Sequence, residues 1–271
     1  MSYTTLGLFT YDPVHVAPEI AACLFAIVAV TLTIQTIKTT SACWMYILVG
    51  TAISESIGYI LRAICTKYSS LGLFIAMSLF LLLPPNALAL FNYKTVGEIS
   101  RISYDPDRKF WLKPRFITWF FFGSDVFAFI IQSTGGSMTI TEDTKVSGRW
   151  ICVVGLAVQL VFLLAFTLIA ITVLRNPLYK VTKGPKDDDE RVAKRRVMWV
   201  ILGTTALLYM RSIYRLIEFV DGYGGKIYSA EWAFYVFDFV PIFLMFLIYI
   251  VFFIGYNFPR YGVSGSSIAL C

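Results

Sequence analysis

Seven long apolar segments, each about as long as a membrane-spanning helix, constrain this chain more than any other feature of its sequence. They lie at about 17–37, 43–64, 70–93, 115–135, 149–174, 197–219 and 231–257. A helix needs about 20 apolar residues to cross a hydrocarbon core of about 30 Å. Only 15% of the 271 residues are charged, against roughly 25% in an ordinary soluble domain. We therefore predict an all-α membrane protein in which residues 1–271 form a single bundle of seven transmembrane helices.

Lysine and arginine residues gather at one set of helix ends, which predicts how the chain lies in the membrane. About 16 of them flank one side of the predicted bundle and about 5 flank the other. The larger group comprises Lys38, Lys94, Arg101, Arg108, Lys109, Lys113, Arg115, the eight between Arg175 and Arg196, and Arg260. The smaller group comprises Arg62, Lys67, Lys145, Arg149 and Lys226. Because loops rich in Lys and Arg face the cytosol, we expect an outside or lumenal N-terminus and a cytosolic C-terminus, in the plasma membrane or an endomembrane.

Polar and charged side chains interrupt the apolar segments at helical spacing. Three segments carry them at positions i, i+4 and i+7, which share one helix face. The residues are Glu55, Tyr59 and Arg62 in the second segment, Asp125 and Gln132 in the fourth, Gln159 in the fifth, Arg211, Arg215 and Glu218 in the sixth, and Glu231, Tyr235 and Asp238 in the seventh. An ionised side chain in mid-bilayer costs about 2.5–3.5 kcal/mol on insertion scales. We therefore expect these residues to face inward, meet one another and form a ligand-binding polar cavity that is entered from outside or from the outer leaflet.

A purely structural role competes with ligand binding for part of this set. Arg62, Glu218 and Glu231 lie near helix ends, where ion pairs that tie helices together explain them equally well. The aromatic segment 116–131 is better explained by lipid contact and packing than by a binding cage. In the third segment, Pro84 and Pro85 free backbone carbonyls, and Asn86 either caps such a carbonyl or faces ligand.

Composition excludes several other classes of site. The net charge of +6 arises from loops between apolar segments, so we predict membrane lipids and no nucleic acid as partners. Five cysteines without CxxC spacing and a single histidine, His15, argue against a disulfide scaffold and a metal site, although Cys65 and Cys152 lie near the same predicted face and could pair. No nucleotide-binding GxxxxGK[ST] motif is present, and we predict no cofactor. The sequence makes no prediction of oligomeric state.

Five stretches of the chain resemble the fungal aminocholesterol-resistance, or lipid-translocating exporter, family of seven-span membrane proteins. They are ESIGYILR (55–62), LLLPPNALALFNY (81–93), GSDVFAFIIQSTGGSM (123–138), GLAVQLVFLLAF (155–166) and RSIYRLIEFVDGYGGKIYSAEWAFYVFD (211–238). The alanine-rich motif usual in the family's third helix is replaced here by PPNALAL. The resemblance implies that Glu55, Tyr59, Arg62, Asp125, Gln132, Gln159, Arg211, Arg215, Glu218, Glu231 and Asp238 occupy the family's recurring polar positions.

The first hypothesis for function follows from this resemblance and from the predicted cavity. It is binding and translocation, or export, of a lipid-like small molecule of the sterol, sphingoid-base or porphyrin class. Asp125 or Asp238 would then be the candidate proton-linked group, because a buried acidic side chain in a membrane can carry protons.

Two other functions remain open from the sequence. An integral-membrane enzyme would use Asp125, Glu55 or Asp238 as general acid or base on a lipid or terpenoid, although we favour a non-enzymatic role. A seven-helix receptor has the same topology, but Phe91-Asn92-Tyr93-Lys94 stands where the acidic-Arg-Tyr motif of such receptors is expected.

Overall fold

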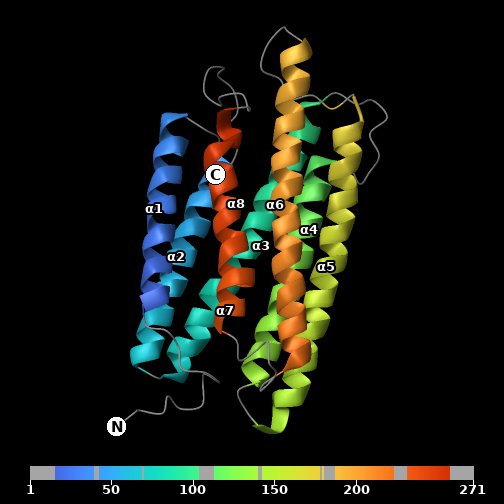
Figure 1. Cartoon of the computed structure of the whole chain (residues 1–271). Coiled ribbons are helices and arrows are strands. Elements are labelled where there is room, and N and C mark those ends of the chain that lie inside the picture. The colour runs from blue at the N-terminus through green and yellow to red at the C-terminus, as the bar shows by residue number, and fades with distance from the viewer. Residues whose placement is uncertain are drawn as a thin grey trace.

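A computed structural model of the protein shows a bundle of long helices that run roughly side by side (Figure 1). It describes residues 16–39, 43–68, 70–103, 113–139, 142–177, 179, 187–222 and 231–256. Within these ranges, seven helical segments are long and apolar enough to cross a membrane, and no residue forms a strand. The prediction of an all-α, seven-helix membrane bundle is therefore confirmed.

The helices follow the predicted apolar segments closely at most of their ends. They are α1 (Val16–Lys38), α2 (Tyr46–Lys67), α3 (Leu71–Ile102), α4 (Pro114–Met138), α5 (Lys145–Arg175), α6 (Asp187–Asp221), α7 (Glu231–Phe234), the π-helical turn η4 (Tyr235–Phe239) and α8 (Val240–Val251). The short 3₁₀ turns η1 (Cys43–Met45) and η3 (Glu142–Thr144) precede α2 and α5. The seventh predicted segment is therefore built from α7, η4 and α8 in succession.

Two helices continue well beyond the apolar segments that predicted them. The third segment was expected to end at residue 93, but α3 reaches Ile102. Glu98 forms ion pairs with Lys94 (2.9 Å) and Arg101 (2.6 Å), and such pairs one turn apart support a helix outside the membrane. The sixth segment was expected to begin at residue 197, but α6 begins at Asp187. Hydropathy does not detect either polar extension.

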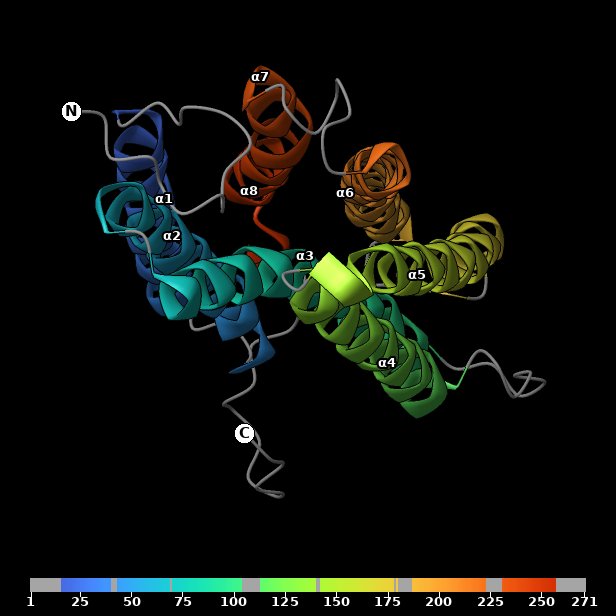
Figure 2. The ribbon, with the colours of Figure 1, turned by 90° about the horizontal axis from the view of Figure 1, so that it is seen from below.

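The bundle is arranged around α3, as the view along the helices shows (Figure 2). Helices α1 and α2 lie on one side of it, and α4 and α5 on the other. Helix α6 contacts α5, α3 and α8, while α8 also contacts α1. Large apolar side chains such as Ile27, Trp119, Val161 and Trp199 remain exposed on the outer surface, as expected where the solvent is lipid.

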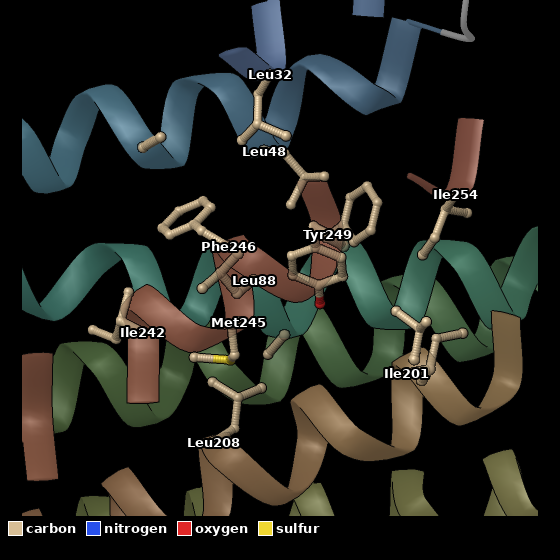
Figure 3. Close-up of a cluster of buried hydrophobic side chains, with 14 of the residues drawn as sticks. Leu32, Leu48, Leu88, Ile201, Leu208, Ile242, Met245, Phe246, Tyr249 and Ile254 are labelled. Atoms are coloured by element: carbon tan, nitrogen blue, oxygen red, sulfur yellow. The ribbon is translucent and has the colours of Figure 1, made fainter. Parts of the chain in front are cut away.

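The helix α8 fills the centre of the apolar core. Figure 3 shows Met245 and Tyr249 of α8 lying between Leu32 and Leu48 of the α1–α2 pair and Leu208 of α6. All of these side chains are buried. The last helix therefore holds the two sides of the bundle together.

A buried polar network lies within this core. The Asn92 side-chain amide of α3 donates to the Thr204 (3.1 Å) and Thr205 (3.3 Å) hydroxyls of α6, and its carbonyl oxygen accepts from the Tyr249 hydroxyl of α8 (2.8 Å). Each of these groups is in this way paired away from water. Asn92 lies in the stretch Phe91-Asn92-Tyr93-Lys94, from which no structural role for it was predicted, and the structure shows it joining three helices.

Glycine allows α4 and α5 to approach each other closely. A Cβ atom built on Gly135 would lie 2.7 Å from the Cys152 sulfur and 2.7 Å from the Gly148 carbonyl oxygen. Small residues at membrane helix contacts let the two backbones pack together. The neighbouring Gly136 has open space beside it.

We predict that Gly135→Ala lowers the free energy of unfolding by about 1–3 kcal/mol, because the added methyl group overpacks this contact. Gly136→Ala is the matched control, and its methyl group meets open space, so stability should change by less than about 1 kcal/mol. Unfolding titrations in mixed detergent micelles measure both variants. Equal stability of the two proteins would show that α4 and α5 do not pack as described.

We also predict that Asn92→Ala lowers the free energy of unfolding by about 1–3 kcal/mol, because it leaves buried hydroxyl groups of α6 and α8 without their partner. The control is Thr172→Ala, since the Thr172 hydroxyl bonds only the Leu168 carbonyl of its own helix at an exposed position. In the same titrations, the free energy of unfolding of the control should lie within about 0.5 kcal/mol of that of the unaltered protein. A loss of similar size in both variants would contradict a special role for Asn92.

Candidate functional site

Three helical segments meet in a buried ionic cluster centred on Asp238 of η4. Arg215 of α6 donates from Nε to Asp238 Oδ1 (2.9 Å) and from Nη2 to Oδ2 (2.9 Å). Arg211, one turn earlier on α6, forms an ion pair with Asp238 Oδ1 at 3.0 Å. The two-point contact of Arg215 is the strongest geometry that a guanidinium and a carboxylate can adopt. Asp238 therefore pairs with two cations at once.

The cluster continues toward the end of the bundle at which α6 ends. Arg215 also donates to Glu218 Oε2 at 3.1 Å. The Arg62 guanidinium of α2 lies over the Phe234 ring of α7 at 4.2 Å, and that of Arg215 lies 5.4 Å from the same ring. An aromatic face attracts a cation, so Phe234 helps to hold two positive charges close together.

Glu55 and Tyr59 of α2 complete this cluster from the other side. Glu55 interacts electrostatically with Arg211, Arg215 and Asp238, and Tyr59 interacts with Glu55 and Asp238. Both side chains are fully buried. Neither carboxyl oxygen of Glu55 nor the Tyr59 hydroxyl has a hydrogen-bond partner among the described residues. The structure thus brings Glu55, Arg211 and Asp238 together inside the bundle.

A local change of helix type positions Asp238. The backbone N–H of Val240 bonds the carbonyl of Tyr235, five residues back, which is the hydrogen bond of a π-helix. Pro241 follows directly and has no N–H with which to continue the α-helical pattern. Such π turns occur frequently at functional sites. The turn shifts the face on which Asp238 lies, a feature that the i, i+4, i+7 spacing does not predict.

The α3 proline pair answers a question that the sequence left open. Pro85 lacks an N–H group, so the carbonyl of Leu81, four residues earlier, has no helical donor. The Arg211 guanidinium donates to that oxygen at 3.2 Å. Gly58 of α2 lies against Leu81, where its Cβ would come within 2.9 Å of a Leu81 methyl group. Arg211, rather than Asn86, therefore caps the free carbonyl and ties the cluster to α3.

The cluster is closed in this structure, whereas the sequence predicted an open polar cavity. Glu55 and Tyr59 are 0% exposed and Asp238 is 1% exposed. Arg215 and Glu218 retain some exposure at the end of the cluster. Opposite charges on neighbouring helices satisfy one another here, which removes the space that a cavity would need. The structure does contain a shallow apolar groove between α1 and α2, lined by Ala26, Ala29, Val30, Thr33, Ile34, Ile53, Ser56 and Ile57, but the packing of Phe25 against Tyr59 separates it from the cluster.

Asp125 does not join this cluster, which corrects the prediction that all the buried carboxylates meet. It lies on α4, and the side chain that faces it is Tyr93 of α3. The Tyr93 hydroxyl lies near the carboxyl group without the geometry of a full hydrogen bond. Tyr93 in turn packs against Phe121 (5.5 Å) and Phe166 (4.5 Å). Because α3 stands between α4 and α2, Asp125 sits in an aromatic site of its own (Figure 2).

The predicted amide residues form a third polar group, also apart from the ionic cluster. The Gln132 amide nitrogen donates to Gln159 Oε1 at 2.9 Å, and the Gln159 amide nitrogen donates to Asn86 Oδ1 at 2.8 Å. This chain joins α4, α5 and α3. Asn86 therefore joins α3 to α5, which is neither of the two roles expected for it from the sequence.

The remaining predicted site residues divide into those that the structure describes and one that it does not. Tyr235 lies beside the Arg62 guanidinium, 5.7 Å from ring centre to carbon. The Glu231 side chain lies outside the described residues, as does His15. Cys65 and Cys152 are buried free thiols and do not pair. Among the residues that the structure describes, no three His, Cys, Asp or Glu side chains could hold one metal ion.

Sequence reasoning missed three contributors to the site. The Leu81 carbonyl is a backbone group, which carries no signal of its own beyond Pro85. Phe234 and Tyr93 looked like ordinary aromatic residues within apolar segments. No spacing rule would have identified Phe234, because the π-helical turn between it and Asp238 departs from the α-helical period.

The chain matches a protein family described as "RTA1 like protein" over residues 47–261. It is 30% identical over 199 residues to Protein RTA1 of Saccharomyces cerevisiae, covering 73% of this chain and 61% of that protein. It is 29% identical over 209 residues to protoporphyrin uptake protein 1 of the same yeast, covering 73% and 65%. With the probable lipid transporter atnI of Emericella nidulans it shares 25% identity over 250 residues, covering 88% and 65%.

The matched regions therefore span less than two thirds of the length of these three relatives. No solved structure matches the chain. The family match covers well over half of the chain and includes every member of the ionic cluster. This multi-pass membrane protein belongs to the RTA1-like family.

Proposed function

We propose that the protein binds lipid-like amphiphiles and moves them across its membrane, and that their polar headgroup is bound at the ionic cluster of α2, α6 and η4. The bonding of the Glu55 side chain is the main support for this proposal. This side chain carries a fully buried carboxyl group beside two guanidinium groups, and its oxygens accept no hydrogen bond from the described residues. A buried polar group without a partner calls for an explanation, and a role in binding a polar headgroup supplies one.

The cluster has the chemistry to bind a polar headgroup. Arg211 and Arg215 present several N–H donors, while Glu55 and Tyr59 present unused oxygen atoms. A headgroup with acceptors can take donors from the arginines, and one with donors can bind Glu55.

The seam between α6 and η4 offers a route from the bilayer to the cluster. Tyr214 of α6 stacks on Phe237 of η4 with ring centres 5.5 Å apart, and Trp232 lies 6.5 Å from Phe237. Ile217 and Val236 are exposed to the membrane on either side of this pair. Opening of the aromatic stack would let a headgroup pass while the tail stays in lipid. With the predicted topology, the route opens to the outer or lumenal half of the membrane.

The names of two relatives agree with this proposal. One is a probable lipid transporter and the other a protoporphyrin uptake protein. A porphyrin and a lipid are both large apolar molecules with polar groups at one edge. We infer that the common ligand class is an amphiphile, and that size and headgroup select among its members.

Vesicles that contain the purified full-length protein test the proposal with two probes, protoporphyrin IX and a fluorescent phospholipid analogue. We expect the protein to accelerate the movement of at least one probe across the bilayer relative to protein-free vesicles. Recovery of the probe in unchanged form separates transport from catalysis. Equal rates in both kinds of vesicle for both probes would contradict the proposed function.

We predict that Arg215→Lys slows probe movement by about tenfold, because lysine keeps the charge but loses the two-point contact, and one charge-assisted hydrogen bond contributes about 1.5 kcal/mol. Arg101→Lys is the matched control, since Arg101 also pairs with a glutamate three residues away, but at the far end of α3. The control should transport at the unaltered rate. Thermal unfolding of both variants, measured in the same detergent, separates a transport defect from misfolding. Equal flux in both variants would show that the headgroup does not bind at the ionic cluster.

A further inference from the structure

The buried carboxyl groups of the cluster differ sharply in their bonding. Asp238 accepts two hydrogen bonds from Arg215 and pairs with Arg211, and Glu218 accepts one hydrogen bond from Arg215. Glu55 accepts none, although it interacts with the same two arginines. Glu55 is thus a carboxyl group of the cluster that accepts no hydrogen bond from the described residues, although guanidinium groups lie beside it.

The charged and titratable groups that face Glu55 come from two neighbouring elements and its own helix. Arg211 and Arg215 face it from α6 and Asp238 from η4, while Tyr59 lies one turn further along α2. Helices α1 and α3 also pack against α2. Among their described residues, none interacts electrostatically with Glu55. The surroundings of Glu55 are therefore set by the cluster itself.

The lack of accepted hydrogen bonds beside guanidinium groups favours a carboxyl group that carries a proton over an ionised one. An ionised carboxylate beside guanidinium groups accepts their N–H bonds, as Asp238 does here. A protonated carboxyl group competes weakly for these donors and does not suffer the cost of an unpaired ion in an apolar interior. The closed cluster is therefore consistent with a protonated Glu55 and an ionised Asp238.

We propose that Glu55 is a proton-binding site and that proton binding there is coupled to ligand movement, which makes the protein a proton-coupled transporter. This inference rests on the proposed transport function and adds its energy source. Glu55 accepts a proton from one side of the membrane and releases it to the other as the cluster becomes accessible to each side. No bond other than the carboxyl O–H forms or breaks.

Loss of the proton rearranges the contacts that close the site. An ionised Glu55 competes with Asp238 for Arg211, whose guanidinium also holds the Leu81 carbonyl of α3. Movement of Arg211 toward Glu55 weakens its contacts to η4 and α3 together. Those elements, with α6, enclose the cluster. Release of the proton and access of the headgroup are in this way linked through one side chain.

The other buried acidic residue lacks these features. Asp125 faces Tyr93 inside a packed aromatic group, and no arginine interacts with it among the described residues. Its protonation cannot redistribute ion pairs between helices. The structure thus favours Glu55 over Asp125 and Asp238, the two residues that the sequence suggested as proton-linked.

The test uses the full-length protein, the variant Glu55→Gln, which mimics the protonated acid, and the control Asp125→Asn. The vesicle assay with protoporphyrin IX and the fluorescent phospholipid is repeated under an imposed pH gradient. With one proton exchanged per ligand, a gradient of one pH unit sustains about a tenfold ratio of probe across the membrane. We expect this response in the unaltered protein and in Asp125→Asn, and its loss in Glu55→Gln.

A second measurement separates proton binding from transport. The infrared carbonyl band of protonated carboxyl groups, followed during a pH titration of the purified protein, should include a component that Glu55→Gln removes and Asp125→Asn keeps. Absence of a Glu55-dependent component overturns the inference, whatever the vesicles show. If a Glu55-dependent component is present but the flux does not change with the pH gradient, then proton binding is not coupled to transport. Failure of both probes to move at all contradicts the proposed transport function, while the infrared result still decides whether Glu55 binds a proton.

Discussion

The pairing of Asp238 with two arginines is the interaction on which the arrangement of the bundle depends. Around it, the solvent is hydrocarbon and cannot stabilise an isolated charge. Asp238 therefore holds η4 against α6, and Arg211 extends the same contact to α3 through the Leu81 carbonyl. Removal of one partner from a buried pair costs about 3–5 kcal/mol, because the other charge is left alone. The three elements consequently keep their relative positions as a unit.

A buried ionic cluster of this kind contributes little net stability to a fold. Well-packed apolar residues of similar volume commonly match or exceed a buried ion pair in stability. The nearby contact of Asn92 with α6 and α8 shows that this bundle also joins helices with neutral groups. Three arginines and three carboxylates within reach of one another are therefore better explained by a requirement for charge at this place. Ligand binding is such a requirement.

The sequence predicted the helices and their polar faces but not how those faces meet. Long apolar runs specify spans, and the i, i+4, i+7 spacing specifies which side of α2 and α6 is polar, so the meeting of Glu55 with Arg211 was predictable. The separation of Asp125 was not, because a helical period contains no information about which neighbour stands between two helices. The position of Asp238 depends on a π turn, and one partner of Arg211 is the backbone oxygen of Leu81. Neither feature has a pattern of side chains that predicts it. The prolines Pro241 and Pro85 are the sequence signals associated with them.

An unpaired carboxyl group beside two satisfied ion pairs also has a kinetic consequence. To open the cluster by pulling Arg211 away from Asp238 into lipid would leave a charge without a partner, and the barrier would be high. Glu55 offers a second acceptor within the same enclosure, so Arg211 can exchange one carboxylate for another without ever being unpaired. Arg215 meanwhile keeps its two-point contact with Asp238. A buried cluster in which one carboxyl group accepts no hydrogen bond is therefore suited to rearrange, whereas a fully matched one, such as the Asn92 network, is suited to stay fixed.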